Sequence, residues 1–283
     1  MKNMSKTAKF FLTCAAAFTL GLVLTIGGCA AGGMKGIEKA VDGSGWNIST
    51  DPASAVTVEN DYEFSSIEAT GEADLVIAGS RYYDEALDEL EARGIEAKAG
   101  KVVVVYDSSR EEPEVRTEGT KLVIDAGKGD NTVHFSDEFF GPKVIVFCGD
   151  KELESVSVSS SACDLDIMGV SFKTADIGMN TGDVDLKDIT SSGLKVEADA
   201  GDIEIAGVLK GGTEVKSDAG SIEIDVFNDI SSYTMDLHTD AGEIKLGEDE
   251  IDGTSYTQKG GKDSITARTD AGDIEVGSLL KKS

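Results

Sequence analysis

A short acidic turn recurs through the C-terminal half of the chain and limits what that half can fold into. It reads ADAGDIEI from Ala198, and close relatives of it begin at Ser217, Thr239 and Thr269. The residue at the centre of each turn is, in chain order, Cys163, Gly182, Gly201, Gly220, Gly242 and Gly272. The intervals between these residues are 19, 19, 19, 22 and 30 residues. A nearly fixed period of this length is typical of stacked structural repeats.

Apolar and polar residues alternate on both sides of each turn. Ile203 and Ile205 follow Gly201 by two and four residues, and Val196 precedes it by five. Period-two alternation indicates half-buried strands, and the spacing of an amphipathic helix is absent. One strand–turn–strand copy cannot bury its own apolar face, so successive copies should stack in register about 4.8 Å apart. The pattern therefore predicts an all-β, single-domain parallel β-solenoid, or β-helix, with rungs of about 19 residues stacked in chain order.

The part of the chain before the repeats is less regular but also rich in strand-like segments, such as DLVIAG and KVIVFCGD. Its exception is YYDEALDELEARG, in which Ala86, Leu87 and Leu90 would lie on one face of a short helix. We expect one β-solenoid domain over residues 60–283. Its irregular part, 60–150, would cap the first sheet edge, and its regular repeats would occupy 151–283. The polar stretch between Leu246 and Ser264 is expected to project from the coil as a loop.

The N-terminal residues 1–35 resemble a membrane-targeting segment. Three lysines precede an uncharged run over residues 10–34, which as a helix would span about 37 Å. The segment is either an uncleaved transmembrane signal anchor or a lipoprotein signal in which Cys29, at the end of the lipobox-like IGGC, is lipidated. Both interpretations predict a folded domain that is extracytoplasmic and anchored to the cell membrane through residues 10–34. Residues 36–59 would be a stalk.

The charge of the chain excludes one class of partner. Acidic residues outnumber basic ones by 53 to 26, and the formal net charge is −27. Such a surface repels nucleic acid, so we expect no nucleic-acid partner, and it attracts cations or basic proteins. Because 40% of the residues are hydrophobic and regularly spaced, the acidic composition indicates a packed domain with a charged surface rather than a disordered chain.

The acidic turns are the candidate metal site. In a stack, the carboxylates beside the turns would form ladders of like charge, about 5 Å apart and repelling by roughly 1 kcal/mol in water. One interpretation is that Ca²⁺ bridges neighbouring rungs through hard oxygen ligands. The other is that aspartate suits turn geometry and that salt screens an exposed ladder. The calcium candidates are Asp199, Asp202, Asp218, Asp240, Asp270 and Asp273. No other cofactor is expected.

Candidate catalytic residues are few. The two histidines are His134 and His238, and His238 falls on an outward position of a repeat. No P-loop, dinucleotide fingerprint, zinc spacing or nucleophile elbow is present, so we do not expect an enzyme. Cys148 and Cys163 lie outside the membrane segment, where a disulfide is permitted. A 19-residue rung would place Cys148 near Ile167, several residues from Cys163, and the sequence leaves open both a disulfide and two separate thiols.

The order of these features resembles a bacterial envelope family labelled "putative adhesin". The resemblance covers residues 60–283 and departs from the family pattern at Cys163, which stands in place of a turn glycine. The segments that carry it are FSSIEATGEADLVIAG at 64–79, EEPEVRTEGTKLVIDAG at 111–127 and ELESVSVSSSACDLDIMG at 152–169, followed by NTGDVDL and the later turns. The resemblance implies a β-solenoid domain of envelope proteins that commonly carry an N-terminal membrane segment. It brings no catalytic residues.

These observations together favour a membrane-tethered, extracytoplasmic β-solenoid that acts as a non-catalytic, adhesin-like binding or structural module of the bacterial envelope. Its ligand would be an unidentified protein or envelope polymer. The alternative is an envelope-stress signalling accessory that acts on a membrane partner through residues 10–34. A polysaccharide-active β-helix enzyme is less favoured, because such enzymes line a groove with basic residues and calcium, whereas this repeat face is acidic.

Overall fold

The computed structural model describes most of the chain after residue 54. The described residues are 47–49, 55–89, 95–107, 112–127, 132–134 and 142–279. The predicted anchor over 10–34, Cys29 and most of the expected stalk therefore lie outside them. No helix in these ranges is both long and apolar enough to span a membrane.

The contacts divide the chain into two compact units. The smaller unit comprises 1–52 and 130–139, and within it the structure describes β1 (Asn47–Ser49) and β8 (Thr132–His134), which pair in parallel. The larger unit comprises 53–129 and 140–283.

The larger unit is all-β apart from one α-helix and two short 3₁₀ helices among the described residues, which confirms the all-β part of the predicted fold class. Nineteen of its strands belong to one continuous sheet. In chain order the elements are β2 (Ala55–Asp61), β3 (Ser66–Thr70), β4 (Asp74–Ala78), η1 (Ser80–Tyr82), α3 (Tyr83–Glu89), β5 (Lys101–Asp107), β6 (Glu114–Glu118), β7 (Lys121–Asp125), β9 (Lys143–Phe147), β10 (Leu153–Ser160), β11 (Leu165–Met168), β12 (Ser171–Thr181), β13 (Val184–Ala200), β14 (Ile203–Ala219), β15 (Ile222–Val226), η2 (Ile230–Ser232), β16 (Thr234–Thr239), β17 (Ile244–Leu246), β18 (Asp249–Ile251), β19 (Ser255–Gln258), β20 (Ser264–Ala271) and β21 (Ile274–Ser278).

The repeats form rungs, each made of the strand segment before a turn and the segment after it. We name each rung of the repeat region by its turn residue, from the Cys163 rung (β10 and β11) to the Gly272 rung (β20 and β21). Ile203 pairs in parallel with Val184 on one side and Ile222 on the other, so the register offset equals the 19-residue interval of the sequence. These three side chains are no more than 1% exposed. The alternating apolar residues therefore form continuous buried columns.

Strands β4 and β9 do not alternate, because they are covered on both faces. Their sequences, DLVIA and KVIVF, are buried at four consecutive residues each. The outer side chains of these strands join Ala86 of α3 and Val103 of β5 in a second small core. Tyr83 of α3 meets the Phe147 ring edge-on at 4.8 Å between centroids. The short helix predicted around Ala86 is thus confirmed, while Leu90 lies outside the described residues.

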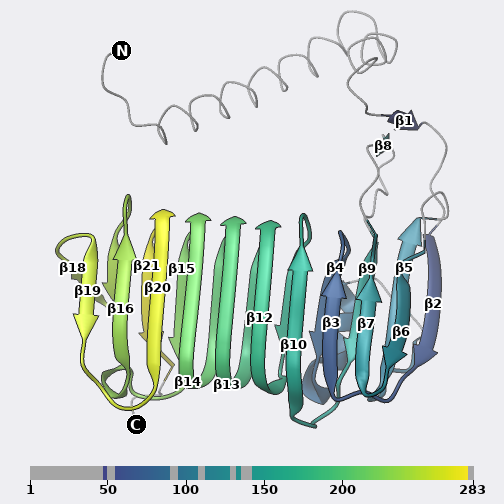
Figure 1. Cartoon of the computed structure of the whole chain (residues 1–283), viewed down its shortest axis with the longest axis horizontal. Coiled ribbons are helices and arrows are strands. Elements are labelled where there is room, and N and C mark those ends of the chain that lie inside the picture. The colour runs from purple at the N-terminus through teal and green to yellow at the C-terminus, as the bar shows by residue number, and fades with distance from the viewer. Residues whose placement is uncertain are drawn as a thin grey trace, which may run out of the picture. The chain divides into compact units, whose positions relative to one another are not determined.

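The rungs are not stacked in chain order, and this prediction is wrong at both ends. Thr269 of β20 pairs with Ser217 of β14 on one side and with Thr239 of β16 on the other. The last rung in the sequence therefore lies between the Gly220 and Gly242 rungs (Figure 1). At the other end, β3 and β4 lie between the β7–β9 pair and the Cys163 rung.

The rungs at the C-terminal end leave chain order because the two intervals between the last three turns are longer than 19 residues. The 22-residue interval before Gly242 is three residues longer than a rung. An extended residue covers about 3.3 Å, so three extra residues suffice to step across one additional rung of about 4.8 Å. The 30-residue interval before Gly272 then carries the chain out to the end of the stack and back into the gap.

The prediction that the stretch between Leu246 and Ser264 projects from the coil as a loop is also wrong. It forms β18, which pairs antiparallel with β17, and β19, which pairs antiparallel with β16. These strands cover the edge of the Gly242 rung, which would otherwise expose a row of unpaired backbone groups. At the opposite end β6 pairs antiparallel with β7, and β2 and β5 extend the sheet beside β9. Strand β2 begins at Ala55, within the range expected to be a stalk.

Candidate functional site

The turn glycines hold neighbouring rungs close together. Gly182, Gly201, Gly220 and Gly272 have φ angles between +123° and +156°. A Cβ on Gly201 would lie 2.7 Å from the carbonyl carbon of Gly182 and nearer still to its oxygen. Side chains of L-residues rarely accept such a φ, so these glycines serve the scaffold.

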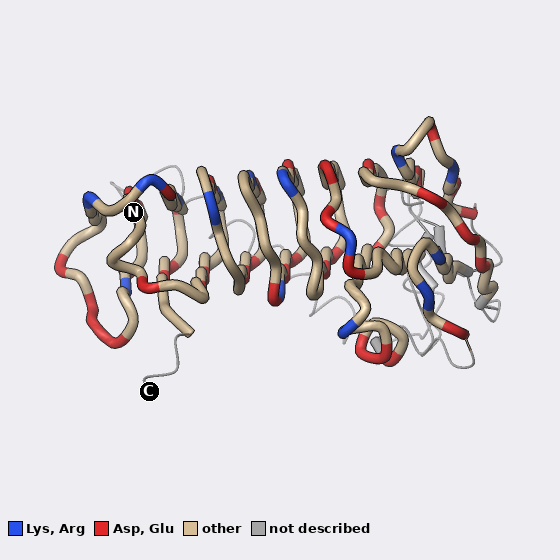
Figure 2. Tube along the Cα trace, turned by 90° about the horizontal axis from the view of Figure 1, so that it is seen from below, with Lys and Arg blue, Asp and Glu red and all other residues tan. Residues whose placement is uncertain are grey.

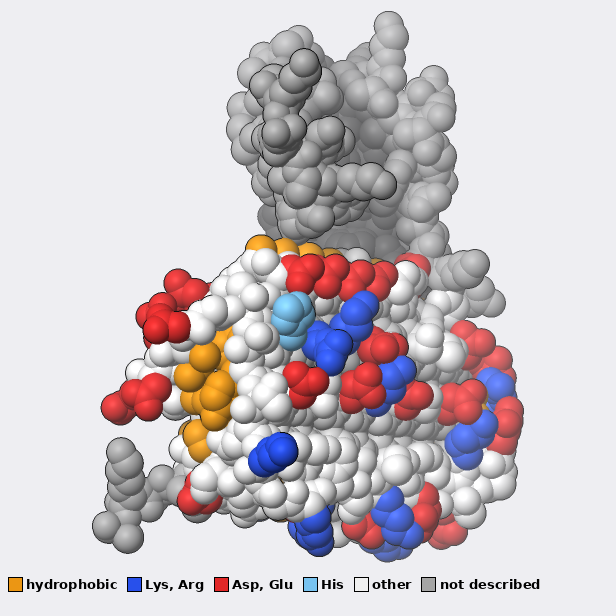
Figure 3. Space-filling view, turned by 60° about the vertical axis from the view of Figure 1, so that its left-hand side comes forward, with side chains coloured by type: hydrophobic (Ala, Val, Ile, Leu, Met, Phe, Trp, Pro, Cys, Tyr) orange, Lys and Arg blue, Asp and Glu red, His pale blue; other side chains and the backbone are white. Residues whose placement is uncertain are grey.

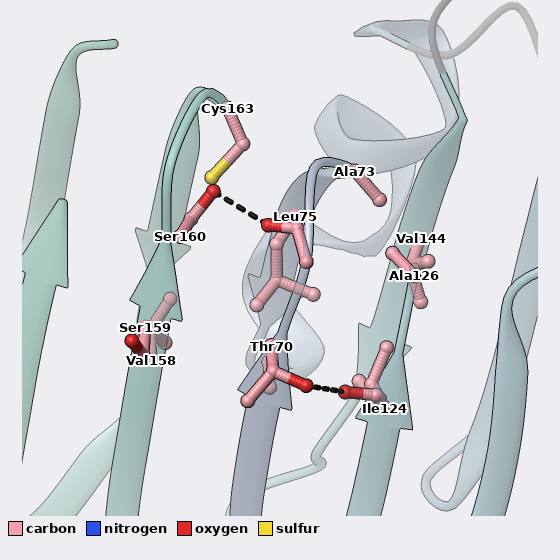
Figure 4. Close-up of a pocket in the computed structure, with 12 residues that line it drawn as sticks. Thr70, Ala73, Leu75, Ile124, Ala126, Val144, Val158, Ser159, Ser160 and Cys163 are labelled. Carbon is pink, nitrogen blue, oxygen red and sulfur yellow. Dashed lines mark hydrogen bonds between the residues drawn. The ribbon is translucent and has the colours of Figure 1, made fainter. Parts of the chain in front are cut away.

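Cys163 departs from this column because its neighbouring rung has a wider turn. The rung beside it is formed by β3 and β4 and turns through Gly71 and Ala73. Cys163, Ala73 and Ser160 line a small cavity of about 10 Å³ (Figure 4). The Ser160 hydroxyl donates to the Gly71 carbonyl at 2.6 Å.

The aspartates that follow the turns are bonded to the backbone of the next rung. The backbone N–H of Asp202 donates to Oδ1 of Asp183 at 2.9 Å, and the N–H of Ser221 donates to Oδ1 of Asp202 at 2.7 Å. In the same way the N–H of Glu243 donates to Oδ1 of Asp273 at 2.8 Å. Hydrogen bonds to a charged acceptor are the stronger kind. They offset the repulsion within this ladder and occupy two of the calcium candidates, Asp202 and Asp273.

The aspartates that precede the turns form a separate, exposed row in the order Asp199, Asp218, Asp270 and Asp240, because the adjacent residues pair in that order. Lys216 Nζ lies 2.7 Å from Oδ1 of Asp218. Figure 3 shows acidic side chains in a line next to basic ones on this face.

The six calcium candidates are therefore divided between two rows. Among the residues that the structure describes, no group of three or more His, Cys, Asp or Glu side chains could hold a metal ion. The structure does not bring the candidates together into a calcium site. The backbone hydrogen bonds and exposed positions instead match the turn-geometry and screening interpretation of the sequence.

A third acidic row was not identified from the sequence. The third residue after each turn is Asp166, Asp185, Glu204, Glu223, Glu275 and finally Lys245 in spatial order. We call the five acidic residues of this series the carboxylate row. Acidic residues recur from rung to rung along the stack (Figure 2). The signal was present in the sequence as a constant position three residues after the turn.

The carboxylate row is crowded and partly shielded from water. Burial, followed by the charges of Asp225, Glu204 and Glu275, raises the pKa of Glu223. Burial and Glu275 likewise raise the pKa of Asp225, which lies two residues after Glu223 in β15. The arrangement therefore favours anything that brings positive charge to this face. Chemically it is a row of carboxylates whose charge is complementary to cationic groups.

Cys148 and Cys163, the two cysteines within the described residues, are free thiols and are buried. Burial raises the pKa of both, that of Cys163 to about 11. Cys148 follows β9, which is separated by β4 from the β11 strand that holds Ile167. The expectation that Cys148 stacks beside Ile167 is wrong because the β3–β4 rung lies between them.

Of the two histidines, the structure describes the side chain of His238 only. His238 is 43% exposed at its side chain, and its Nε2 lies 2.9 Å from Oδ1 of Asp240. This is the outward position expected from the sequence. The side chain of His134 lies outside the described part.

Comparison with known proteins agrees with this geometry. A family model described as Toastrack DUF4097 matches residues 116–277, more than half of the chain. No curated protein matches the chain.

Three solved structures are similar in fold. A "putative cell adhesion protein" of Clostridium sporogenes is 15% identical, with 80% of this chain and 100% of that chain covered and a TM-score of 0.50. A "putative lipid binding protein" of Parabacteroides distasonis is 13% identical, with 82% and 100% covered and a TM-score of 0.37. A "putative adhesin" of Bacteroides fragilis is 11% identical, with 79% and 97% covered and a TM-score of 0.34. The first similarity establishes a shared fold, and the two lower scores carry no argument.

Proposed function

Because the chain belongs to the Toastrack DUF4097 family, as the adhesin-like resemblance of its sequence anticipated, we propose that it is a parallel β-solenoid serving as a non-catalytic, adhesin-like binding or structural module of the bacterial envelope. The uncharged run over 10–34 supports a membrane tether with the folded part outside the cytoplasm. Cys29 offers lipidation as the alternative form of the tether.

The carboxylate row is the observation that carries this proposal. Five acidic side chains repeat at the strand spacing over neighbouring rungs, which gives a long row that is mainly acidic, with Lys187 beside Asp185. A surface of this form suits an extended ligand that carries regularly spaced cationic groups, as a basic protein or a cationic envelope polymer does. A compact substrate pocket would call for a different geometry.

An attachment assay tests the proposal. Bacterial cells that carry the full chain are compared with cells that lack it, on a polylysine-coated surface. Replacing Glu204, Glu223 and Glu275 by Gln should lower attachment by about tenfold, since each exposed charge contributes up to about 1 kcal/mol. The matched control replaces Asp199, Asp218 and Asp270 by Asn, which changes the net charge equally on the other face and should preserve attachment. Equal attachment with and without the chain would refute a binding role.

An anchor exchange separates the tether from signalling. Replacing residues 10–34 by an unrelated membrane anchor should leave attachment unchanged if the solenoid does the binding. A stress phenotype that disappears in the exchanged chain, while the chain stays at the surface, would instead support a signalling accessory. Release of product from an acidic glycan would support the enzyme alternative.

A further inference from the structure

The Gly272 rung is held on both sides by rungs that precede it in the sequence. On one side Gly220 N–H donates to the Ala271 carbonyl at 3.0 Å, and Ile222 N–H donates to Asp273 at 2.9 Å. On the other side Gly272 N–H donates to the Ala241 carbonyl at 3.0 Å. The threonine hydroxyl of Thr269 adds a bond of 3.0 Å to the Gly220 carbonyl. Residues 264–278 thus fill a slot between the Gly220 and Gly242 rungs (Figure 1).

The Gly242 rung depends on this insertion. Within the described residues its parallel pairing is with β20 and β21 alone. Its remaining strand partners, β18 and β19, are its own antiparallel cap. The rung therefore reaches the rest of the stack through the inserted segment and through the linker that precedes β16.

That linker and the segment leading into β20 cross each other closely. Tyr233, at the end of the linker, is 1% exposed, and its hydroxyl donates to the Leu209 carbonyl at 2.9 Å. Gly261 N–H donates to the Ser232 carbonyl at 2.7 Å. A Cβ on Gly260 would lie 2.9 Å from the backbone nitrogen of Thr234. The crossing therefore needs small residues on the incoming segment.

Asp263 joins both walls of the slot at its entrance. Its carboxylate accepts the N–H of Gly211 at 2.8 Å, on the β14 side. Its carbonyl accepts the N–H of Thr234 at 2.9 Å, on the β16 side. At the exit, Leu279 N–H donates to the Val226 carbonyl at 3.0 Å. The inserted segment is thus fastened at its two ends as well as along its length.

We propose that residues 264–278 are a latch and that the slot between the Gly220 and Gly242 rungs is the site that binds this strand–turn–strand segment of the same chain. The latch joins the Gly242 rung and the β18–β19 cap to the rest of the stack. Opening is therefore asymmetric. Release of the latch opens the Gly242 rung as well, whereas loss of the Gly242 rung leaves the latch bound to β14 and β15. A stack in chain order would give the reverse dependence.

Hydrogen exchange of the full chain, measured segment by segment, tests this asymmetry. Ile274→Ala removes a fully buried side chain from the latch, and Leu237→Ala removes a fully buried one from the Gly242 rung. Ile274→Ala should raise exchange over 264–278 and 234–246 by the same factor, on the order of 30-fold or more. Leu237→Ala should raise it over 234–246 and by less than about threefold in the latch amides that face β14 and β15. Residues 184–200 should be unaffected by either.

Acceleration of the latch alone by Ile274→Ala, or of both segments by Leu237→Ala, would overturn the proposal. A second measurement covers the case in which Ile274→Ala does not fold. The native full chain is given a protease site in the exposed turn 252–254, where a Cβ on Gly253 would meet nothing within 4 Å, and is cut there. A fluorescent peptide of residues 255–279 is then added in excess. The peptide should replace the cut segment, and 234–246 should stay protected only while the slot is filled. Failure of the peptide to bind, or protection of 234–246 with the slot empty, contradicts the latch.

Discussion

The substitution Gly201→Ala tests how closely the rungs approach at their turns. The new Cβ would lie 2.7 Å from the carbonyl carbon of Gly182 and 3.1 Å from Oδ1 of Asp183. Carbon atoms normally approach to about 3.5–4.0 Å, so the Gly182 and Gly201 turns would have to separate by about 1 Å. The ladder bond from Gly182 N–H to Ala200 is already 3.1 Å long, as is that from Gly201 N–H to Ala219. Both of these hydrogen bonds lie close to the point at which the two turns would move apart.

The cost follows from three contributions. A φ of +137° costs a side-chain-bearing residue about 1–3 kcal/mol. Overpacking adds about 1–3 kcal/mol, and each weakened ladder bond adds about 0.5–1.5 kcal/mol. Allowing for partial relaxation, we expect a loss of about 3–6 kcal/mol, which is a large share of the stability of an ordinary domain.

Gly119→Ala is the matched control. Gly119 also has a positive φ, +66°, but a Cβ there would meet nothing within 4 Å. Gly119→Ala should lower the free energy of unfolding by only about 1–2 kcal/mol, which is the cost of placing an L-residue at a positive φ. Urea unfolding followed by circular dichroism measures both variants. If the two free energies of unfolding differ by less than about 1 kcal/mol, close approach at the turns does not limit this stack.

Three other predictions concern the acidic rows. Asp202→Ala should lower the free energy of unfolding by about 1 kcal/mol through the lost bond to Ser221 N–H, and Asp202→Asn, which keeps an acceptor oxygen, should lower it less; equal losses in urea melts would contradict the role of that oxygen. The folded-state pKa of Glu223 is raised above its ordinary value of 4.5, so the folded protein holds this proton more tightly. Its stability should therefore decline as the pH rises from about 4.5 through the raised pKa, and Glu223→Gln should flatten that part of a pH series of urea melts. Calcium should raise the melting temperature no more than magnesium does at equal concentration, because the described carboxylates form rows rather than a cage; a calcium-specific rise in scanning calorimetry would restore the bridging interpretation.

The columns of each rung could be predicted from the sequence, because alternation is a local property. Ile203 and Ile205 are buried in the structure as their spacing from Gly201 requires. The order of the rungs could not be predicted in the same way. Ile244 and Ile274 occupy equivalent places after their turns, so either copy fits beside Ile222. Only the lengths of the intervals distinguish the two arrangements, and interval length does not by itself state which gap a later segment fills.

The acidic ladders show a second limit on what the sequence alone can predict. From the sequence, Asp202 is one more member of a repelling row, and a bound cation is a reasonable remedy. In the structure, the backbone N–H of Ser221 donates a hydrogen bond to Asp202 and so offsets this repulsion. That bond depends on the offset of one rung against the next, which alternation alone does not define. For the carboxylate row, the position three residues after the turn is constant in the sequence, but the neighbours of each carboxylate depend on the order of the rungs.

The exchanged order of the terminal rungs also limits how a chain of this kind can change in length. A further copy added after Gly272 would meet no free strand edge in the described stack, because the Gly272 rung is already enclosed. A copy added before β3 would meet the same obstacle, because the β3–β4 rung has neighbours on both sides. A 19-residue unit can be gained or lost without disturbing either end only in the middle, around β12 to β14. Growth of this protein by repeat duplication would therefore proceed from its centre, with both ends carried outward unchanged.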